Sequence, residues 1–387
     1  MKINNLLLIV LVFLPIVSGC SHQGDNSQNG VVTLDFTRDY EGITLNLSDM
    51  VKDISIIRLE TNENSLMSYF KGFVGDKYIL SFGRKSIKLF SSEGKFIQTI
   101  INRGKGPREF GYIDMWTVDE DEHFYYCHDA GKNDIYKYNL DKRKFEDNIP
   151  FSDNGHLSGM VIVNDTTFAI LTNSYSSYKY QCFYQTFSGR VLDGIVRDSV
   201  SIPKERSFKH AVFMNTKNRK DIVLQPASSD TLYYLSGIKK IPSIYLKNNV
   251  TKISGSTKTG DVIELYNFIE DKVLLSKKEF VMEKKSNHIF MSVKNGDTYI
   301  ANTLSEEINV LDSIYYESIG AWLDPKKILR SNNNRFICSY DAISFRAILK
   351  NAIDDVELTE EKRRNVRNLF DKITDDDNPV LITGKYK

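Results

Sequence analysis

The chain has 387 residues, of which 41% are hydrophobic and 26% are charged. This balance supports a sizeable buried core and excludes intrinsically disordered and collagen-like sequences. The 51 Lys and Arg residues and the 50 Asp and Glu residues leave a formal charge of +1, so no overall field attracts nucleic acid, and no nucleic-acid partner is predicted. Aromatic residues make up 12% of the chain and Pro occurs only 8 times, which is typical of many short strands.

The first 20 residues have the pattern of a bacterial export signal. Lys2 precedes the apolar run Leu6–Leu14, and Val17–Gly19 stand directly before Cys20. The run is too short to cross about 30 Å of hydrocarbon as a helix, which needs roughly 20 apolar residues. The residues that end at Cys20 resemble a lipobox, which implies that residues 1–19 are a lipoprotein signal peptide and that Cys20 is diacylated on sulfur. An ordinary signal peptide that ends in a cysteine is the alternative.

Residues 20–30 are then predicted to be a flexible, lipidated tether, because Ser21 to Gly30 include no large apolar residue. Lipid chains contribute about 0.8 kcal/mol per buried CH₂, and two chains give stable anchoring, so membrane lipid is the predicted partner of acylated Cys20. By the sorting habit of such lipoproteins, Ser21 after the cysteine favours the bacterial outer membrane. The periplasmic and cell-surface faces both remain open.

Most of the chain repeats one pattern six times. Each copy has a turn rich in Asp, Asn or Gly, an apolar strand, a polar gap and a second strand. Equivalent strand residues recur 44 to 63 positions apart: Tyr78, Phe124, Phe168, Ile222, Val273 and Phe336. A period of roughly 40–50 residues with four strands per unit is typical of propeller blades. We therefore expect an all-β fold, a single six-bladed β-propeller domain over residues 31–387 with about four antiparallel strands per blade.

Both ends of the repeat region contain further elements. Ile54–Leu59 is predicted to be an early strand and Pro379–Tyr386 a final one, and we expect the two to share a blade and close the ring. Apolar residues recur at helical spacing over Phe345–Val356 and, after Thr359 as a plausible N-cap, over Val366–Ile373. This pattern predicts a short helical insertion before the closing strand, with both apolar stripes packed on the propeller.

Three cysteines follow Cys20 at wide spacing: Cys127, Cys182 and Cys338. Their odd number and spacing indicate neither a disulfide framework nor a Cys-x-x-Cys metal knuckle. Because each has aromatic neighbours, we expect isolated thiols buried in strands.

Three segments in addition to the lipobox resemble a known family. They are Gly104–Phe110 after the first repeat, Ser229–Tyr233 in the fourth and Asp377–Leu381 near the end. Together with the six repeats, they are similar to segments of six-bladed β-propeller lipoproteins from gut-dwelling Gram-negative bacteria. The resemblance covers essentially the whole mature chain and implies the fold and the compartment. Arg108 departs from the pattern, because a small residue is expected in that turn.

Two segments are candidates for ligand binding. Arg103, Lys105 and Arg108 surround a glycine-rich turn and form a basic patch that suits a carboxylate or an acidic sugar. The structural alternative is a rigid connection between blades with solvated charges. Tyr175 and Tyr178 belong to a Tyr-rich segment that suits stacking on sugars, and cross-strand packing is the alternative for them.

No motif assigns a catalytic residue or a metal ligand. Asp119–Glu122 is predicted to be a solvated turn, because four consecutive acids cannot all point one way from an extended hairpin. His123 and His128 are predicted to lie on opposite faces of a strand, which argues against a shared metal. Neither a nucleophile elbow nor a His and acid cluster for a zinc site is present in the sequence.

The favoured function is that of a membrane-anchored binding or scaffold lipoprotein, which presents the propeller to a glycan, peptide or protein ligand. The alternative is a calcium-dependent, lactonase-like or other hydrolase with its site in the central channel. The favoured function predicts no cofactor, and calcium belongs only to the alternative.

Overall fold

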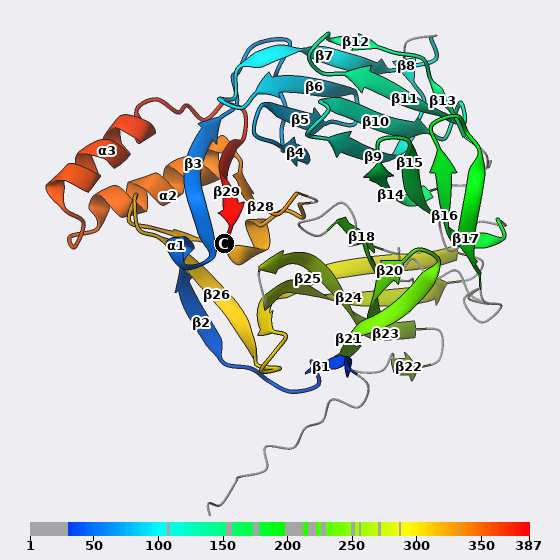
Figure 1. The fold of residues 1–387 in the computed structure, drawn as a ribbon. Helices are drawn as coiled ribbons and strands as arrows, with labels where there is room; N and C mark the ends of the chain where they lie inside the picture. The colour runs from blue at the N-terminus through cyan, green and yellow to red at the C-terminus, as the bar shows by residue number, and fades with distance from the viewer. Residues whose placement is uncertain are drawn as a thin grey trace, which may run out of the picture.

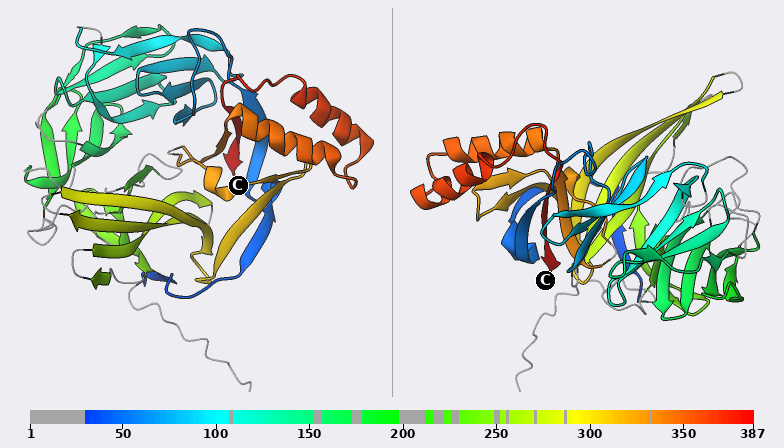
Figure 2. Two further views of the ribbon diagram at one scale, coloured as in Figure 1. Left: turned by 180° about the vertical axis from the view of Figure 1, so that it is seen from behind. Right: turned by 90° about the horizontal axis from the view of Figure 1, so that it is seen from above.

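The apolar runs of the six repeats form strands in six separate β-sheets, which a computed structural model of the chain arranges as a ring (Figures 1 and 2). The predicted all-β, six-bladed propeller with a short helical segment before its last strand is confirmed. The structure describes residues 30–106, 109–151, 157–172, 178–197, 212–215, 222–225, 230–248, 252–254, 257–269, 272–285, 288–331 and 333–387. Cys20, Arg108 and Tyr175 lie outside these described residues.

Blades 1, 2 and 3 are each built from consecutive strands. Blade 1 contains β4 (Gly72–Val74), β5 (Tyr78–Phe82), β6 (Ser86–Ser91), β7 (Phe96–Arg103) and β8 (Glu109–Phe110). Blade 2 contains β9 (Ile113–Asp119), β10 (Phe124–Asp129), β11 (Asp134–Asn139), β12 (Lys144–Phe145) and β13 (Ile149–Pro150). Blade 3 contains β14 (Leu157–Asn164), β15 (Thr167–Thr172), β16 (Tyr180–Thr186) and β17 (Val191–Val196).

Blades 4, 5 and 6 each include a strand from the N-terminal region as well. Blade 4 contains β18 (Val212–Asn215), β19 (Ile222–Gln225), β20 (Thr231–Ser236), β21 (Lys239–Lys247) and β1 (Val32–Asp35). Blade 5 contains β22 (Lys252–Ser254), β23 (Thr257–Ile269), β24 (Lys272–Lys285), β25 (His288–Asn302), β26 (Ile308–Tyr316), β27 (Ala321–Leu323) and β2 (Gly42–Asn46). Blade 6 contains β28 (Arg335–Tyr340), β29 (Val380–Tyr386) and β3 (Val51–Arg58).

The middle strands are buried on both faces, because each blade packs between two others. In β5, Ile79 belongs to an apolar cluster with Leu381 of blade 6, whereas the next residue, Leu80, belongs to a cluster with Tyr125 of blade 2. Successive side chains of a strand point to opposite faces, so both faces of these strands need apolar residues. This packing explains why the repeats contain continuous apolar runs instead of alternating ones.

Strands from both ends of the chain close the ring. β29 pairs antiparallel with β28 on one side and with β3 on the other, so the C-terminal strand lies in the middle of blade 6. β1 pairs in parallel with β21, and β2 pairs in parallel with β26. After β2, the short helix α1 (Leu47–Met50) leads into β3, so the N-terminal segment adds a strand to blades 4, 5 and 6 in turn. The prediction that one blade combines strands from both termini is confirmed.

The two predicted helices follow β28 and lie outside the ring (Figure 2). They are α2 (Ala342–Asp354) and α3 (Glu360–Phe370), and the predicted N-cap Thr359 accepts a hydrogen bond from a backbone N–H in the first turn of α3. Phe345 and Val366, on the apolar stripes, are fully buried in a cluster with residues of blades 5 and 6, as predicted. The prediction is wrong for Val356, which lies beyond the end of α2 and is 90% exposed. Within the described residues, no helix is long and apolar enough to span a bilayer.

The three cysteines beyond the N-terminus are free and buried, as predicted. Cys127 lies in β10, Cys182 in β16 and Cys338 in β28. Burial raises the pKa of each thiol to about 12. These side chains therefore act as small apolar groups in the core.

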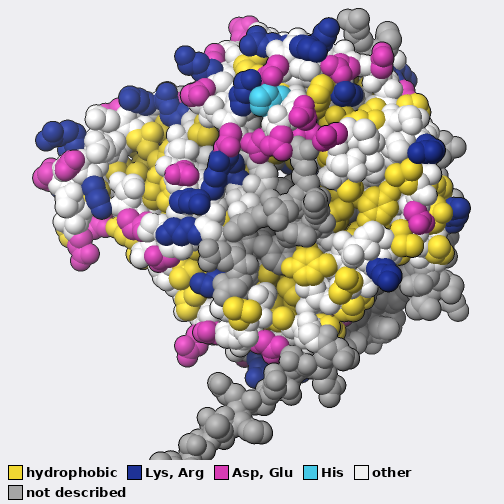
Figure 3. Space-filling view, in the orientation of Figure 1, with side chains coloured by type: hydrophobic (Ala, Val, Ile, Leu, Met, Phe, Trp, Pro, Cys, Tyr) yellow, Lys and Arg dark blue, Asp and Glu magenta, His cyan; other side chains and the backbone are white. Residues whose placement is uncertain are grey.

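Charged and apolar side chains are unevenly distributed over the face of the ring that Figure 3 shows. On the face shown, charged side chains gather over blades 1 and 2, whereas hydrophobic side chains are exposed over blades 3 and 4. The overall charge near zero therefore hides an uneven distribution of side chains over the blades.

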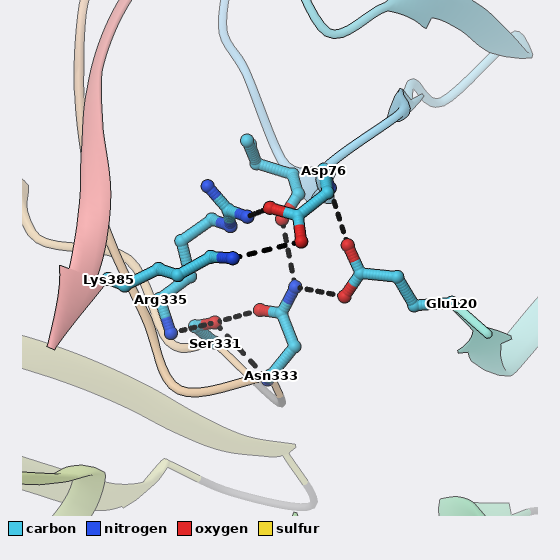
Figure 4. A network of polar contacts seen from close by, with 7 residues as sticks. Asp76, Glu120, Ser331, Asn333, Arg335 and Lys385 are labelled. Atoms are coloured by element: carbon cyan, nitrogen blue, oxygen red, sulfur yellow. Dashed lines mark hydrogen bonds and ion pairs between the residues drawn. The ribbon is translucent and has the colours of Figure 1, made fainter. Parts of the chain in front are cut away.

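A polar network joins blades 6, 1 and 2 at one end of the ring (Figure 4). The Asp76 carboxylate in the β4–β5 turn accepts hydrogen bonds from Arg335 of β28 and, at 2.9 Å, from Lys385 of β29. Asn333, just before β28, donates to the Glu120 carboxylate of the β9–β10 turn at 3.1 Å. Blade 6 is thus connected to blades 1 and 2, which are distant from its C-terminal strands in sequence, by charge-assisted hydrogen bonds.

The acidic turn Asp119–Glu122 is not simply solvated, so the prediction for it is wrong in part. The Asp119 side chain is buried and accepts a hydrogen bond from the backbone N–H of Glu122 at 3.0 Å. Glu120 belongs to the network between blades. Each of these two carboxylates therefore has a specific partner that the local sequence did not indicate.

Candidate ligand-binding site

A cavity of about 400 Å³ opens where blades 1 and 2 meet. Its walls come from four segments: the approach to β4, the β5–β6 turn, the end of β7 and the crossover from β8 into β9. The strands β4 to β7 are antiparallel to their neighbours, so successive turns alternate between the two ends of the ring. The four segments therefore meet at the end opposite the β4–β5 turn, which contains Asp76 of the polar network. Loops that a rigid scaffold holds at one end of a propeller are suited to ligand binding.

Aromatic side chains form much of the cavity wall. The rings of Phe82 and Trp116 lie against each other with centroids 4.0 Å apart and an interplanar angle of 31°. Tyr125 stacks on Phe82 at 5.6 Å and supports it from the core. Tyr69 and Tyr112, also in the wall, are 50% and 57% exposed. Accessible aromatic faces of this kind suit stacking against a sugar ring.

Three cationic side chains line the same cavity: Lys71, Arg84 and Arg103. All three are exposed, and none has an ion-pair partner or a side-chain hydrogen bond among the described residues. They come from three separate segments, so positive charge is concentrated locally although the whole chain is nearly neutral. Such a group of donors attracts an anion and can form charge-assisted hydrogen bonds with it.

Asp114 is the one carboxylate among the described residues that line the cavity. Its Oδ1 lies 2.7 Å from Nδ1 of His128, and its Oδ2 accepts a hydrogen bond at 2.9 Å from the backbone N–H of Leu157, the first residue of β14. His128 is fully buried, and its ring lies 4.5 Å from that of Phe151. Asp114 is thereby held between blades 2 and 3.

Metal ligation finds no support in the described residues, where no group of three or more His, Cys, Asp or Glu side chains could hold an ion. His123 instead lies 2.8 Å from Asp141 in a separate pair, and His128 is occupied by Asp114. The cavity therefore offers cations and aromatic faces.

Asp129 holds the crossover that carries Tyr112 into the cavity wall. Its fully buried carboxylate accepts hydrogen bonds from the backbone N–H groups of Gly111, Tyr112 and Gly131, each at 3.0 Å. A Cβ on Gly131 would lie 3.2 Å from Oδ1 of this carboxylate, which is tighter than an ordinary contact. The three donors compensate the desolvation of a buried charge and fix the loop geometry.

The described glycines that follow Arg103 lie close to Glu109. The backbone N–H of Gly106 donates to the Glu109 carboxylate at 2.8 Å, and Lys132 of blade 2 donates to the Gly106 and Glu109 carbonyls at 2.9 and 2.7 Å. A Cβ on Gly104 would lie 2.0 Å from Oε2 of Glu109, so a larger residue here would require the Glu109 side chain to shift. Gly106 and Glu109 are thus tied to each other and to blade 2, and Arg103 before them presents a cation to the cavity.

The structure separates the ligand-binding candidates that the sequence singled out. Arg103 lines the cavity, whereas Lys105 is exposed in the same connection and is not among the described lining residues. Tyr178 lies in blade 3, where its ring packs 5.0 Å from that of Phe183, and it does not line the cavity. The other two candidates, as noted, are outside the described residues.

The wall contains residues that sequence reasoning did not identify, among them Lys71, Arg84, Tyr112 and Trp116. They belong to no motif, and they meet only because blades 1 and 2 pack side by side. Their positions were the only indication in the sequence that they could belong to a site. Most of them lie at or near strand ends in the first two repeats, where the loops at one end of the ring begin.

A family model matches most of the chain, and a solved structure has a similar fold. A family model described as a domain of unknown function, DUF4934, matches residues 31–385. No curated protein matches the chain. A solved structure from Bacteroides fragilis, described as a putative exported protein, is similar with a TM-score of 0.61 and 10% identity, covering 92% of this chain and 100% of that one. A member of the DUF4221 family from Bacteroides vulgatus has a TM-score of 0.42 and 12% identity, covering 87% and 97%.

Proposed function

This chain belongs to the DUF4934 family, and we propose that it is an exported, lipid-anchored protein that binds an acidic carbohydrate in the cavity between blades 1 and 2. One observation carries the proposal. Three cationic side chains without ion-pair partners among the described residues converge with accessible aromatic rings on one cavity. The fold supports a binding role, because the loops at one end of the ring form a concave surface on a rigid scaffold.

An acidic sugar suits this lining better than other ligands do. The guanidinium groups of Arg84 and Arg103 can bind a carboxylate in bidentate fashion, and the aromatic rings can cover the apolar face of a sugar. A neutral sugar would make no use of the cations, and a small inorganic anion would make no use of the rings. The volume of about 400 Å³ lies within the usual range for small-molecule sites.

Lipid anchoring at Cys20 is the second part of the proposal. The support is the lipobox-like segment that ends at Cys20 and the polar stretch Ser21–Gly30, which leads to the first strand of the ring. The similar Bacteroides protein is described as exported, which agrees with such an address. We expect the outer membrane to be the site of anchoring, with the propeller in the periplasm or at the cell surface.

A glycan array that pairs uronic-acid oligosaccharides with their neutral counterparts tests the ligand class. We expect the chain from Cys20 onward, with Cys20→Ser, to retain acidic glycans and to leave the neutral counterparts unbound. Binding of neutral glycans alone, or of none, contradicts the proposal. Cleavage products that form only with calcium would assign the hydrolase alternative instead.

A further inference from the structure

The turns at the end of the ring opposite the cavity differ from blade to blade. In blades 1 and 2, the β6–β7 and β11–β12 turns contain mostly charged residues, among them Glu93, Lys95, Asp141, Lys142 and Arg143. In blades 3, 4 and 5, exposed apolar side chains lie in or beside the corresponding turns: Leu192 at 49%, Ile238 at 47% and Leu304 at 79% exposure. Figure 3 shows such a division between charged side chains over blades 1 and 2 and hydrophobic ones over blades 3 and 4.

Two more exposed side chains extend this apolar surface along blade 4. Tyr234 and Ile241 are cross-strand partners in the β20–β21 hairpin and are 38% and 48% exposed. The hydroxyl of Tyr184 in β16 donates to the carbonyl of Gly237 at 2.7 Å, which joins the hairpin turn to blade 3. We call the five exposed residues the apolar arc: Leu192, Tyr234, Ile238, Ile241 and Leu304.

The N-terminal strand begins beside this apolar arc. Val32 pairs with Ile244 in a parallel register, so the N-terminal end of β1 points toward the β20–β21 turn. The backbone N–H of Thr33 donates to Oε1 of Glu306 at 3.1 Å, so the start of β1 also lies next to the β25–β26 turn, which carries Leu304. The polar stretch that leads back to Cys20 therefore starts between two parts of the apolar arc.

The length of that stretch limits how far a lipid on Cys20 can lie from the ring. Ten residues, Ser21–Gly30, separate Cys20 from Val31. Fully extended, they span at most about 35 Å. A bilayer that holds acylated Cys20 must therefore lie within this distance of the apolar arc.

We propose that the apolar arc rests in the headgroup region of the bilayer that anchors Cys20; this inference rests on the proposed lipid anchor. Leu and Ile side chains remove apolar surface from water at that depth, and Tyr234 keeps its hydroxyl hydrated. The short tether raises the effective concentration of the arc at the membrane, so a few side chains suffice for docking. The charged turns of blades 1 and 2 remain in water.

Docking in this way directs the ligand cavity away from the membrane. The strand of blade 4 that corresponds to β7 is β21. Arg103 lies at the end of β7, whereas the β20–β21 turn lies at the beginning of β21. The cavity and the apolar arc thus lie at opposite ends of the ring. Blades 1 and 4 also lie across the ring from each other (Figure 1). A soluble glycan can then reach the cavity without passing the bilayer.

Quenching of tryptophan fluorescence by brominated lipid tests this orientation. The chain from Cys20 to Lys387 is coupled through the Cys20 thiol to maleimide lipid in phosphatidylethanolamine–phosphatidylglycerol vesicles, while the three buried thiols stay unreacted. Ile238→Trp is compared with Lys142→Trp, whose position is in the equivalent turn of blade 2 and whose native side chain is 64% exposed. We expect at least twofold more quenching for Ile238→Trp than for the parent with its 2 tryptophans, and no increase for Lys142→Trp.

Adding Leu192→Ser and Leu304→Ser to Ile238→Trp should return the quenching to the parent level without changing the thermal unfolding temperature. Equal quenching at both tryptophan positions, or none at position 238, overturns the proposal. The sample without vesicles could instead contain a dimer that the serine substitutions dissociate. That result would assign the arc to a contact with a second copy of the chain and would also overturn the proposal. Because maleimide coupling replaces natural acylation, mass spectrometry of Cys20 from cells tests the lipid anchor separately.

Discussion

The carboxylate of Asp76 lies 2.9 Å from Nζ of Lys385, although 309 positions separate the two residues (Figure 4). Asp76 belongs to the first blade and Lys385 to the C-terminal strand, so this ion pair spans the junction at which the ring closes. Burial opposes ionisation of Asp76, but hydrogen bonds from Lys385 and Arg335 outweigh burial and lower the pKa of the carboxyl below its ordinary value.

This ion pair predicts a pH-dependent contribution to stability. The folded-state pKa of Asp76 lies below the unfolded value of about 3.9, so ionised Asp76 stabilises the fold above that pH. The contribution is lost as the pH falls through the folded-state pKa. Since the Asp76 side chain is 63% exposed, we expect Asp76→Asn to reduce the free energy of unfolding by about 1 kcal/mol or less at pH 7.

Urea unfolding of both proteins between pH 7 and pH 3 measures this difference, which should shrink toward the acid end. Lys385→Met should produce a loss of similar size at pH 7 and add little to Asp76→Asn. A difference that stays constant with pH would show that the carboxylate charge is not its cause.

The central position of β29 predicts a large effect of truncating one of its buried side chains. Leu381 is fully buried between blades 6 and 1, so Leu381→Ala removes apolar contacts and leaves a cavity. We expect a loss of about 2–5 kcal/mol in the free energy of unfolding. Val356→Ala is the matched control, because Val356 is 90% exposed and its truncation should cost less than about 0.5 kcal/mol. Equal losses in the two variants would contradict the placement of β29.

Removal of the whole final strand should have a larger effect. Deleting Pro379–Lys387 leaves both β28 and β3 without their shared partner and exposes their apolar faces. We expect aggregation or the loss of cooperative thermal unfolding, measured by calorimetry and light scattering. A truncated chain that melts like the full one would rule out this ring closure.

The buried thiols predict resistance to alkylation in the native state. With pKa values raised to about 12 by burial, the thiols of Cys127, Cys182 and Cys338 remain protonated at pH 8, and reagents cannot reach them. In Cys20→Ser, we expect all three to react with a disulfide reagent only after denaturant is added. Ile238→Cys provides the positive control, because its exposed position should react within seconds to minutes. Rapid reaction of Cys20→Ser without denaturant would contradict the buried placement.

The cavity predicts different effects for two cations in the same connection. Arg103 lines the cavity and Lys105 does not, so Arg103→Ala should weaken binding of an acidic glycan about tenfold, whereas Lys105→Ala should change it less than about twofold. Trp116→Ala should also weaken binding through the loss of stacking. Calorimetric titration at low and high salt should show that the Arg103 effect decreases with salt. Equal effects of the two cation variants would place the ligand elsewhere.

Lipidation at Cys20 predicts a change of compartment on substitution. Cys20→Ser removes the sulfur that would carry the acyl chains, so the protein should appear in the soluble fraction or remain unprocessed. Membrane fractionation and mass spectrometry of the N-terminus measure both outcomes. An unchanged, membrane-bound mature form of the variant would contradict acylation at this position.

The blades were predictable because their strands are defined by local side-chain patterns. The run around Ile79 and Leu80 must satisfy two neighbouring blades, so it is apolar on both faces, and this requirement repeats in each unit. The early strand Ile54–Leu59 and the final strand Pro379–Tyr386 also indicated a common blade, because both lie outside the six repeats. The pairing of β1 with β21 and of β2 with β26 had no such signal. The helix that starts after Thr359 followed from its N-cap and apolar spacing.

The candidate site depended on the tertiary structure. Arg103 and Lys105 are two residues apart and chemically similar, yet only Arg103 lines the cavity, because the direction of each side chain depends on how the turn packs against blade 2. Lys71 and Trp116 are 45 positions apart and meet there through the packing of two sheets. Local patterns determine which residues form strands, whereas long-range packing of the blades determines which loop residues become neighbours.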